Sequence, residues 1–287
     1  MNRTTSSRLH VLLLAGTAAL LLGGCCTGLF FHPEAGLRDN PVAQRFTPGE
    51  VVFPSSDSTS LHGWFLPARE PRGTLLVLHG NAENLSTHVN SVLWLVPMGF
   101  SVFIVDYRGY GKSGGTPEVA GIHRDGAAAL EKLFTLPGVD PERVAVLGQS
   151  LGGAIAIQVV ATSPLKGKVK ALVVESSFAG YRLIAREKLA GFPLTWPFQY
   201  PLSWLFDDDY SPLRWVGQVS PVPLLILQSG EDPIVPGHHG QLLFQAARPP
   251  KELWVTAPAG HIQSFADPVL RERLVRFLTE RFAPAKP

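Results

Sequence analysis

The feature that most constrains this chain is the pentapeptide Gly148-Gln149-Ser150-Leu151-Gly152. An apolar run over residues 144–147 precedes it, and small and apolar residues follow it over 153–157. This order predicts a strand, a very tight turn and a helix, because a G-x-S-x-G turn strains the serine backbone and glycine leaves room beside it. Such a turn would lift the Ser150 hydroxyl above the edge of a sheet, near the backbone amides that begin the helix.

Short apolar runs alternate with helical patterns along most of the chain. The predicted strands cover residues 50–53, 61–66, 74–78, 101–105, 143–147, 170–174, 223–228 and 252–255, and the predicted helices cover 84–96, 119–136, 151–161, 240–247 and 269–282. Continuous apolar strands between helices are typical of a mainly parallel sheet with helices on both faces. Residues 179–220 break the alternation and predict a small cap inserted over the sheet edge.

The aromatic residues of that inserted segment predict an apolar pocket for an acyl chain, while a packed pair of surface helices is the competing interpretation. The residues in question are Phe192, Trp196, Phe198, Tyr200, Trp204 and Phe206.

The first 24 residues have the layout of an export signal. Arg3 and Arg8 precede an apolar run over residues 9–22, and Leu22-Gly23-Gly24-Cys25 follows. The last four residues resemble a bacterial lipobox, in which the cysteine carries the lipid. We therefore expect a lipid on Cys25 and a lipoprotein of the bacterial cell envelope, held on a membrane and facing outside the cytoplasm. An uncleaved membrane anchor and an ordinary signal peptide are the alternatives.

Charge and cysteine content narrow the range of partners and crosslinks. The formal net charge is only +2, and cleavage after residue 24 would remove two arginines and no acid, so the charge gives no case for a nucleic-acid partner. Because Cys25 and Cys26 are the only cysteines, no disulfide is expected within the folded domain.

A serine nucleophile requires a base, an acid that orients the base, and donors that hold the oxyanion. His261 follows the last predicted strand, and Asp232 follows the strand at residues 223–228. Serine, acid and histidine thus occur in the chain order expected after this type of turn. The backbone N–H groups of Leu151 and Asn81 are the predicted oxyanion donors.

Other polar residues are assigned to structure or to solvent. His79 is interpreted as holding the turn after its strand, and His238 and His239, which open a helix, are expected to be solvated. The run Asp207-Asp208-Asp209 is interpreted as a solvated acidic turn, since no histidine or cysteine lies near it in the sequence. We expect neither a metal nor a cofactor.

Five motifs stand in the order found in the α/β-hydrolase superfamily. They are His79-Gly80-Asn81, Asp106-Tyr107-Arg108-Gly109-Tyr110-Gly111, the Ser150 pentapeptide, Gly230-Glu231-Asp232 and Gly260-His261. Over residues 48–285 the chain resembles the serine-hydrolase branch related to Bem46 and the ABHD13 and ABHD17 proteins. Glu83 stands where that branch commonly has glycine.

The resemblance implies the α/β-hydrolase fold, with a mostly parallel eight-stranded sheet, helices on both faces and a small cap at about residues 179–220. The expected organisation is a signal peptide at 1–24, a lipid-anchored tether and lead-in at 25–47, and the hydrolase domain at 48–287.

The expected reaction is hydrolysis of a carboxylic ester or thioester through an acyl-enzyme. Ser150 would attack, His261 would take its proton, and Asp232 would orient His261. Two alternatives stay open, a serine peptidase of the same fold and a catalytically silent envelope protein that binds without cleaving.

Overall fold

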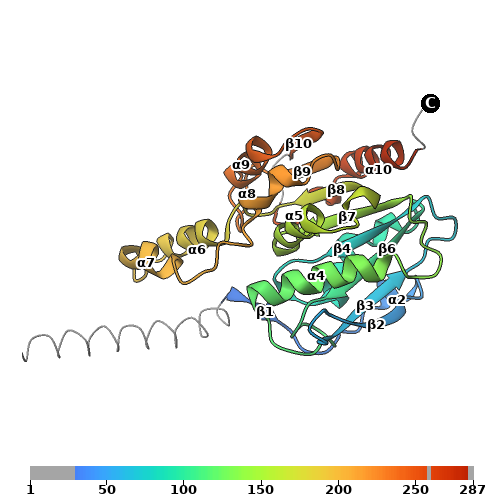
Figure 1. Ribbon diagram of the computed structural model, residues 1–287, viewed down its shortest axis with the longest axis horizontal. Coiled ribbons are helices and arrows are strands. Elements are labelled where there is room, and N and C mark those ends of the chain that lie inside the picture. The colour runs from blue at the N-terminus through green and yellow to red at the C-terminus, as the bar shows by residue number, and fades with distance from the viewer. Residues whose placement is uncertain (1–29, 257–259, 284–287) are drawn as a thin grey trace, which may run out of the picture.

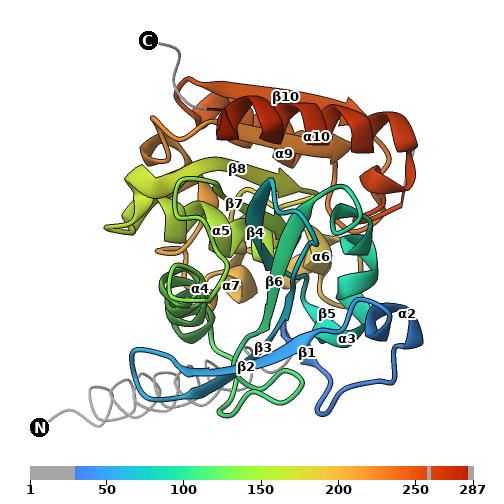
Figure 2. The ribbon, with the colours of Figure 1, turned by 90° about the vertical axis from the view of Figure 1, so that its right-hand side faces the viewer.

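The computed structural model describes residues 30–256 and 260–283. An eight-stranded sheet forms its centre (Figure 1 and Figure 2). In spatial order its strands are β10 (Lys251–Thr256), β9 (Leu224–Ser229), β8 (Val169–Glu175), β7 (Val144–Gln149), β4 (Gly73–Leu78), β6 (Phe100–Asp106), β3 (Ser60–Leu66) and β2 (Gly49–Pro54). The β2–β3 and β3–β6 pairs are antiparallel and the other pairs are parallel. The prediction of a mostly parallel eight-stranded sheet is therefore confirmed.

The two faces of the sheet bury alternate residues of the same strands, as the pleat of a strand requires. In β4, Leu76 and Leu78 join one hydrophobic core, while Leu75 and Val77 join the other. The first core is closed by α4 (Val119–Leu133), α5 (Leu151–Thr162) and α9 (His238–Ala246). The second is closed by α3 (Leu85–His88) and α10 (Pro268–Phe282).

The prediction of one continuous helix over residues 84–96 is wrong. The segment folds as the short α3 followed by two 3₁₀ turns, η1 (Val89–Ser91) and η2 (Leu93–Leu95). Side chains compete here for the backbone carbonyls: Ser91 Oγ donates to His88 O at 2.8 Å, and Trp94 Nε1 donates to Ser91 O at 3.0 Å. Such bonds offer the backbone an alternative to a continuous α-helix.

The lead-in segment is folded onto the rest of the chain from Phe30 onward. Its short strand β1 (His32–Pro33) pairs in parallel with β5 (Ala82–Glu83), which follows the loop after β4. Asn40 then caps α2 (Pro41–Gln44) by accepting from Ala43 N at 2.9 Å. The segment before the main sheet is therefore in contact with the loop that the sequence assigns to the oxyanion.

The chain leaves the sheet between β8 and β9 and forms the cap. The cap contains α6 (Tyr181–Ala190), α7 (Gln199–Ser203) and α8 (Pro212–Trp215). The α6–α7 pair packs together and extends away from the sheet (Figure 1). Five of its six aromatic residues named above are exposed, so these side chains do not form the expected apolar pocket. The segment forms a helix pair instead, in which α6 packs against α7.

None of the helices in the described ranges is long and apolar enough to cross a membrane.

Candidate active site

Ser150 occupies the turn between β7 and α5, in a backbone conformation that non-glycine residues seldom adopt. Its φ is 54°, inside the left-handed region. A Cβ on Gly152 would stand 1.9 Å from Leu78 O, and a Cβ on Gly148 would stand 2.3 Å from Gly152 O. Larger residues at these two positions would push β4, β7 and α5 apart, so close packing around the turn holds the strained serine in place.

Strand register brings two further loops to Ser150. Leu78 pairs with Gly148, so the loop after β4 lies beside the loop after β7. A Cβ on Gly80 would lie 3.6 Å from Ser150 Cβ and 3.2 Å from Ile262 Cδ1. The nucleophile turn, the predicted oxyanion loop and the turn that carries His261 therefore meet at the carboxyl edge of the sheet, where ligands bind in open α/β sheets.

Asp232 and His261 form a direct pair. His261 Nδ1 lies 2.8 Å from Asp232 Oδ2 and 3.0 Å from Asp232 Oδ1. The backbone amides of Ile234 and Val235 also donate to Asp232 Oδ1, at 2.8 and 2.9 Å. Burial by itself would raise the pKa of the Asp232 carboxyl, but the hydrogen bonds from His261 and the two amides hold that pKa below its usual value. The carboxylate is thus ionised and fixed in position, as a residue that orients an imidazole must be.

Ser150 and His261 are brought to the same edge but are not hydrogen-bonded to each other within the described part of the chain. Ser150 as a whole is 7% exposed. Hydrogen bonds between catalytic groups are often long in the free enzyme and tighten when substrate binds.

The two predicted oxyanion donors come from the start of α5 and from the loop after β4. Leu151 begins α5, so its N–H belongs to the first turn, which has no partner within the helix. The Asn81 loop is clamped by Tyr110, whose hydroxyl donates to Asn81 O at 2.8 Å and lies 2.9 Å from Asn81 Oδ1. Asn81 Nδ2 also donates to Phe30 O at 2.5 Å. Tyr110 belongs to one of the sequence motifs, but the motif does not predict its contact with Asn81. No sequence pattern predicts the contact between Asn81 and Phe30.

Glu83 has a φ of 61°, which is a left-handed conformation that favours glycine. Glycine is common at the equivalent position of the Bem46-related branch that the chain resembles. The Glu83 carboxylate lies 3.2 Å from the Arg38 guanidinium, which joins this loop to the lead-in segment.

Glu175 is a buried residue of the site that sequence reasoning missed. It ends β8, and its backbone O accepts from Ser150 N at 2.8 Å. Its carboxylate accepts from Gln149 Nε2 at 2.8 Å and from Ser264 N at 2.9 Å. Burial raises the pKa of this carboxyl against the effect of those two bonds. Glu175 therefore ties the nucleophile turn to the loop after His261, and no local motif around it signals this role.

His79 is fully buried, with Nε2 3.3 Å from Asp106 Oδ1, and its backbone O accepts from Tyr107 Oη at 2.9 Å. These contacts agree with a structural interpretation of His79. The expectation for His239 is wrong, because its side chain is fully buried, whereas His238 is half exposed. The cap covers His239, which sequence spacing alone does not reveal.

Glu187, His238 and His239 form a cluster with the residue types of a metal site. The two histidine Nε2 atoms lie 3.0 and 2.8 Å from the two Glu187 oxygens. His239 Nδ1, however, accepts from the backbone N–H of Ala179 at 3.0 Å. A neutral His239 therefore carries its proton on Nε2, which donates to Glu187 and is not free to bind a metal. The cluster is explained as a hydrogen-bonded link between the cap and α9.

The acidic turn of the cap, Asp207–Asp209, is not part of the Asp232–His261 pair. The Asp209 side chain is 75% exposed and pairs with Arg214, while Asp208 Oδ1 accepts from Arg182 N at 3.2 Å.

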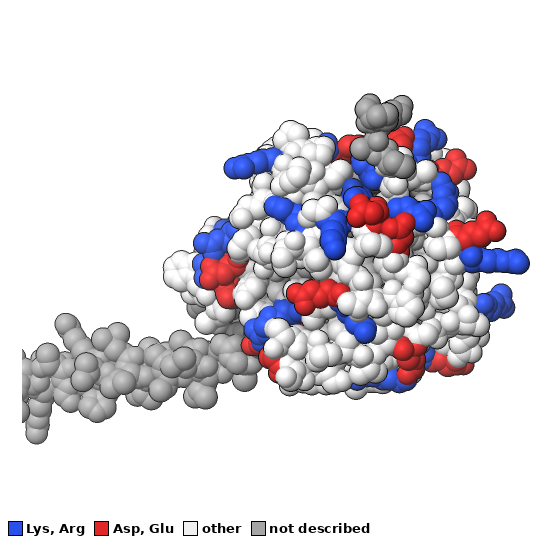
Figure 3. Space-filling model, turned by 45° about the vertical axis from the view of Figure 1, so that its right-hand side comes forward, with Lys and Arg blue, Asp and Glu red and all other residues white. Residues whose placement is uncertain are grey.

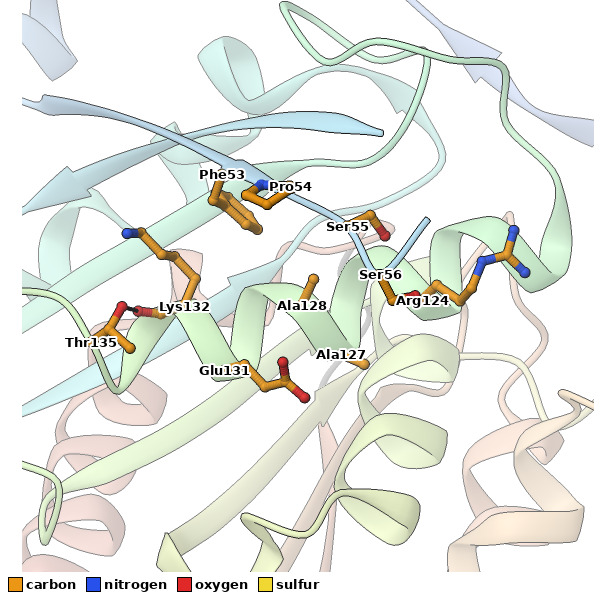
Figure 4. Close-up of a pocket in the computed structure, with 10 residues that line it drawn as sticks. All are labelled: Phe53, Pro54, Ser55, Ser56, Arg124, Ala127, Ala128, Glu131, Lys132 and Thr135. Carbon is orange, nitrogen blue, oxygen red and sulfur yellow. Dashed lines mark hydrogen bonds between the residues drawn. The ribbon is translucent and has the colours of Figure 1, made fainter. Parts of the chain in front are cut away.

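A pocket of about 330 Å³ lies between α4 and the end of β2 (Figure 4). Its charged side chains, Arg124, Glu131 and Lys132, come from different turns of α4 and point in different directions. Ser150, Asp232 and His261 do not line it. Basic and acidic side chains are interspersed over the face seen in Figure 3, without an extended field of one sign. Neither feature therefore competes with the sheet edge at Ser150 as the candidate active site.

Comparisons with known proteins agree with this architecture. The family described as serine aminopeptidase, S33, matches residues 69–197. The chain is similar to the uncharacterized protein YfhR of Escherichia coli K12, with 31% identity over 99% of this chain and 98% of that protein. It is also 31% identical to the alpha/beta hydrolase domain-containing protein WAV2 of Arabidopsis thaliana, over 83% of this chain and 80% of that protein. Among solved structures, the Pyrococcus furiosus esterase Pf2001 shares the fold, with a TM-score of 0.68 and 23% identity over 88% of this chain and 96% of that chain.

Proposed function

The chain belongs to the α/β-hydrolase family, and from that premise we propose that it is a serine hydrolase of carboxylic esters or thioesters. The observation that carries the proposal is the convergence of the strained Ser150 turn with the Asp232–His261 pair at one edge of the sheet. A buried carboxylate on one imidazole nitrogen leaves the other nitrogen free to act as a base.

The proposed reaction begins when Ser150 Oγ attacks the substrate carbonyl carbon and His261 Nε2 takes the hydroxyl proton. The backbone N–H groups of Asn81 and Leu151 hold the oxyanion of the tetrahedral intermediate. The intermediate collapses to an acyl-enzyme, and His261 gives its proton to the departing alcohol or thiol. Water then attacks the acyl-enzyme with His261 again as the base, which releases the acid and restores Ser150.

Labelling with a fluorophosphonate probe tests the nucleophile directly. We expect the purified protein to be labelled on Ser150 and the Ser150→Ala variant to be unlabelled. The variant should lose on the order of 10⁶-fold in kcat on a soluble ester, as expected for the loss of a triad nucleophile. Ser163→Ala is a matched control, because Ser163 caps the far end of α5 and should leave kcat unchanged. An Ser150→Ala variant with parental kcat would refute the mechanism.

A serine peptidase is the second candidate, because the family that matches residues 69–197 is described as a serine aminopeptidase. The same triad would serve either reaction, so substrate choice separates them. We expect p-nitrophenyl esters to be cleaved with a far higher kcat/KM than aminoacyl p-nitroanilides. A higher kcat/KM on the anilides would replace the esterase proposal with the peptidase.

We also propose that Cys25 is lipidated and anchors the protein to a membrane of the bacterial envelope. The lipobox-like Leu22-Gly23-Gly24-Cys25 supports this proposal, and it lies outside the described residues, as does the signal peptide at residues 1–24. Several acyl chains on one cysteine anchor a protein firmly, whereas one chain binds only marginally. Unchanged mass, processing and membrane fraction in a Cys25→Ser variant would rule out lipidation.

A further inference from the structure

The cap exposes an unusual amount of aromatic surface. Within the described residues, every aromatic among the exposed large apolar side chains belongs to the cap. We define the cap patch as Phe192, Leu194, Trp196, Phe198, Tyr200 and Trp204, which are 57–86% exposed. Large exposed apolar side chains gathered in one short segment indicate a place where a partner or a membrane binds.

The packing of the lead-in segment on the cap indicates what lies against this patch. The Phe30 ring packs on Phe206 at 5.6 Å and on Tyr181 at 5.8 Å between ring centroids. The lead-in segment therefore lies against the cap, and β1 and the cap lie at the same end of the molecule in Figure 1. Phe30 lies five positions after Cys25, so their Cα atoms cannot be more than about 18 Å apart even when the chain is fully extended. An anchor at Cys25 would accordingly hold the cap close to the membrane surface.

The chemistry of the patch fits the interface of a bilayer. Tryptophan and tyrosine are favoured at the level of the lipid headgroups, because each ring is apolar and carries one polar group. Phenylalanine and leucine are common beside them on the apolar face of helices that lie in the interface. Positive charge does not dominate the helix pair, because Arg182, Arg186 and Lys188 are balanced by Glu187 and the Asp207–Asp209 turn. Arg186 moreover lies over the Tyr200 ring at 5.3 Å. The contact would depend on apolar insertion rather than on attraction to anionic lipids.

We propose that the cap patch inserts into the headgroup interface of the bilayer to which the chain is anchored. This contact goes beyond the proposed hydrolase activity and rests on the proposed anchor at Cys25. It fixes the orientation of the molecule, with the cap at the lipid surface and the sheet farther from it. If the patch were covered by a second copy of this chain, or remained in water, its tryptophans would not be quenched in the experiment below.

Tryptophan fluorescence in vesicles tests the proposal. Full-length protein from a bacterial host is reconstituted into phosphatidylcholine vesicles, plain or with bromine atoms at defined depths, which quench nearby indole rings. Two of the six tryptophans, Trp196 and Trp204, lie in the patch. We expect stronger quenching by bromines near the headgroups than by bromines near the bilayer centre. The quenching should be unaffected by about 0.5 M salt, a concentration that largely screens the attraction between surface charges.

Conservative variants identify the quenched residues. The double variant Trp196→Phe, Trp204→Phe should lose most of the quenched emission, while Trp94→Phe, which changes a tryptophan bonded to Ser91 O on the other face of the sheet, should keep it. Quenching requires no catalysis, so the test is independent of the proposed activity. Any hydrolysis of a soluble ester should proceed at the same rate in all three proteins. Wild-type protein that floats with the vesicles but is not quenched would refute insertion of the cap. Wild-type protein that does not float would overturn both the anchor and the insertion.

Discussion

Replacing Asp232 by asparagine tests whether this carboxylate orients the base. Asparagine can keep its carbonyl oxygen at the Oδ1 position, where it accepts from Ile234 N and Val235 N at 2.8 and 2.9 Å. Its amide nitrogen then takes the place of Oδ2, which lies 2.8 Å from His261 Nδ1. Two donors would face each other there, so His261 must move its proton to Nε2.

That tautomer cannot accept the Ser150 proton, because Nε2 already carries one. An equivalent Asp→Asn change in a serine protease triad lowers kcat by about 10⁴-fold, or about 5.4 kcal/mol of transition-state stabilisation. We expect a loss of this order for Asp232→Asn on a soluble p-nitrophenyl ester, with the fold checked by circular dichroism.

Asp209→Asn is the matched control. Asp209 also lies between Ser150 and His261 in the chain, but its side chain is 75% exposed and pairs with Arg214. An exposed pair of this kind contributes only about 0–1 kcal/mol to stability, so the variant should fold. Its kcat should be unchanged, because His261 pairs with Asp232. An Asp232→Asn variant within tenfold of the parent, or a large loss in Asp209→Asn, would refute the assignment of the acid.

Three further predictions follow from the same contacts. The lowered pKa of Asp232 stabilises the fold above its ordinary unfolded pKa of about 3.9, and this contribution is lost as the pH falls through the folded pKa. The difference in the free energy of unfolding between the parent and Asp232→Asn should therefore shrink on acidification, and a constant difference would show that this carboxyl is not linked to folding. Gly152→Ala should fail to fold in expression and circular dichroism trials, because its Cβ would stand 1.9 Å from Leu78 O, whereas Gly167→Ala meets nothing within 4 Å and should fold; a folded, active Gly152→Ala would contradict the packing. Glu175→Gln should lower the free energy of unfolding by about 1–3 kcal/mol in urea, since one acceptor becomes a donor facing Gln149 or Ser264, and the exposed Glu142→Gln serves as control. Equal urea midpoints for parent and Glu175→Gln would remove this residue from the support of the site.

Local sequence determined the sheet and the turn at its centre. The apolar strands could be predicted because burial on both faces leaves an unbroken apolar run, as in residues 144–147. The Ser150 turn could be predicted because its two glycines are required by contacts within a few residues of the serine and with the adjacent strand. Asp232 and His261 could be proposed because each follows a predicted strand, and parallel strands end at one edge.

Tertiary structure alone decided the contacts that join distant segments. Glu175 bonds Ser264 across 89 positions, and Tyr110 and Phe30 hold the Asn81 loop from opposite directions along the chain. The burial of His239 depends on the cap, and the exposure of the cap aromatics depends on how far α6 and α7 extend from the sheet. Periodicity records which residues are apolar and which face of their own element they share. It carries no information on which distant segment, or whether water, covers that face, because that is set by packing between elements far apart in the sequence.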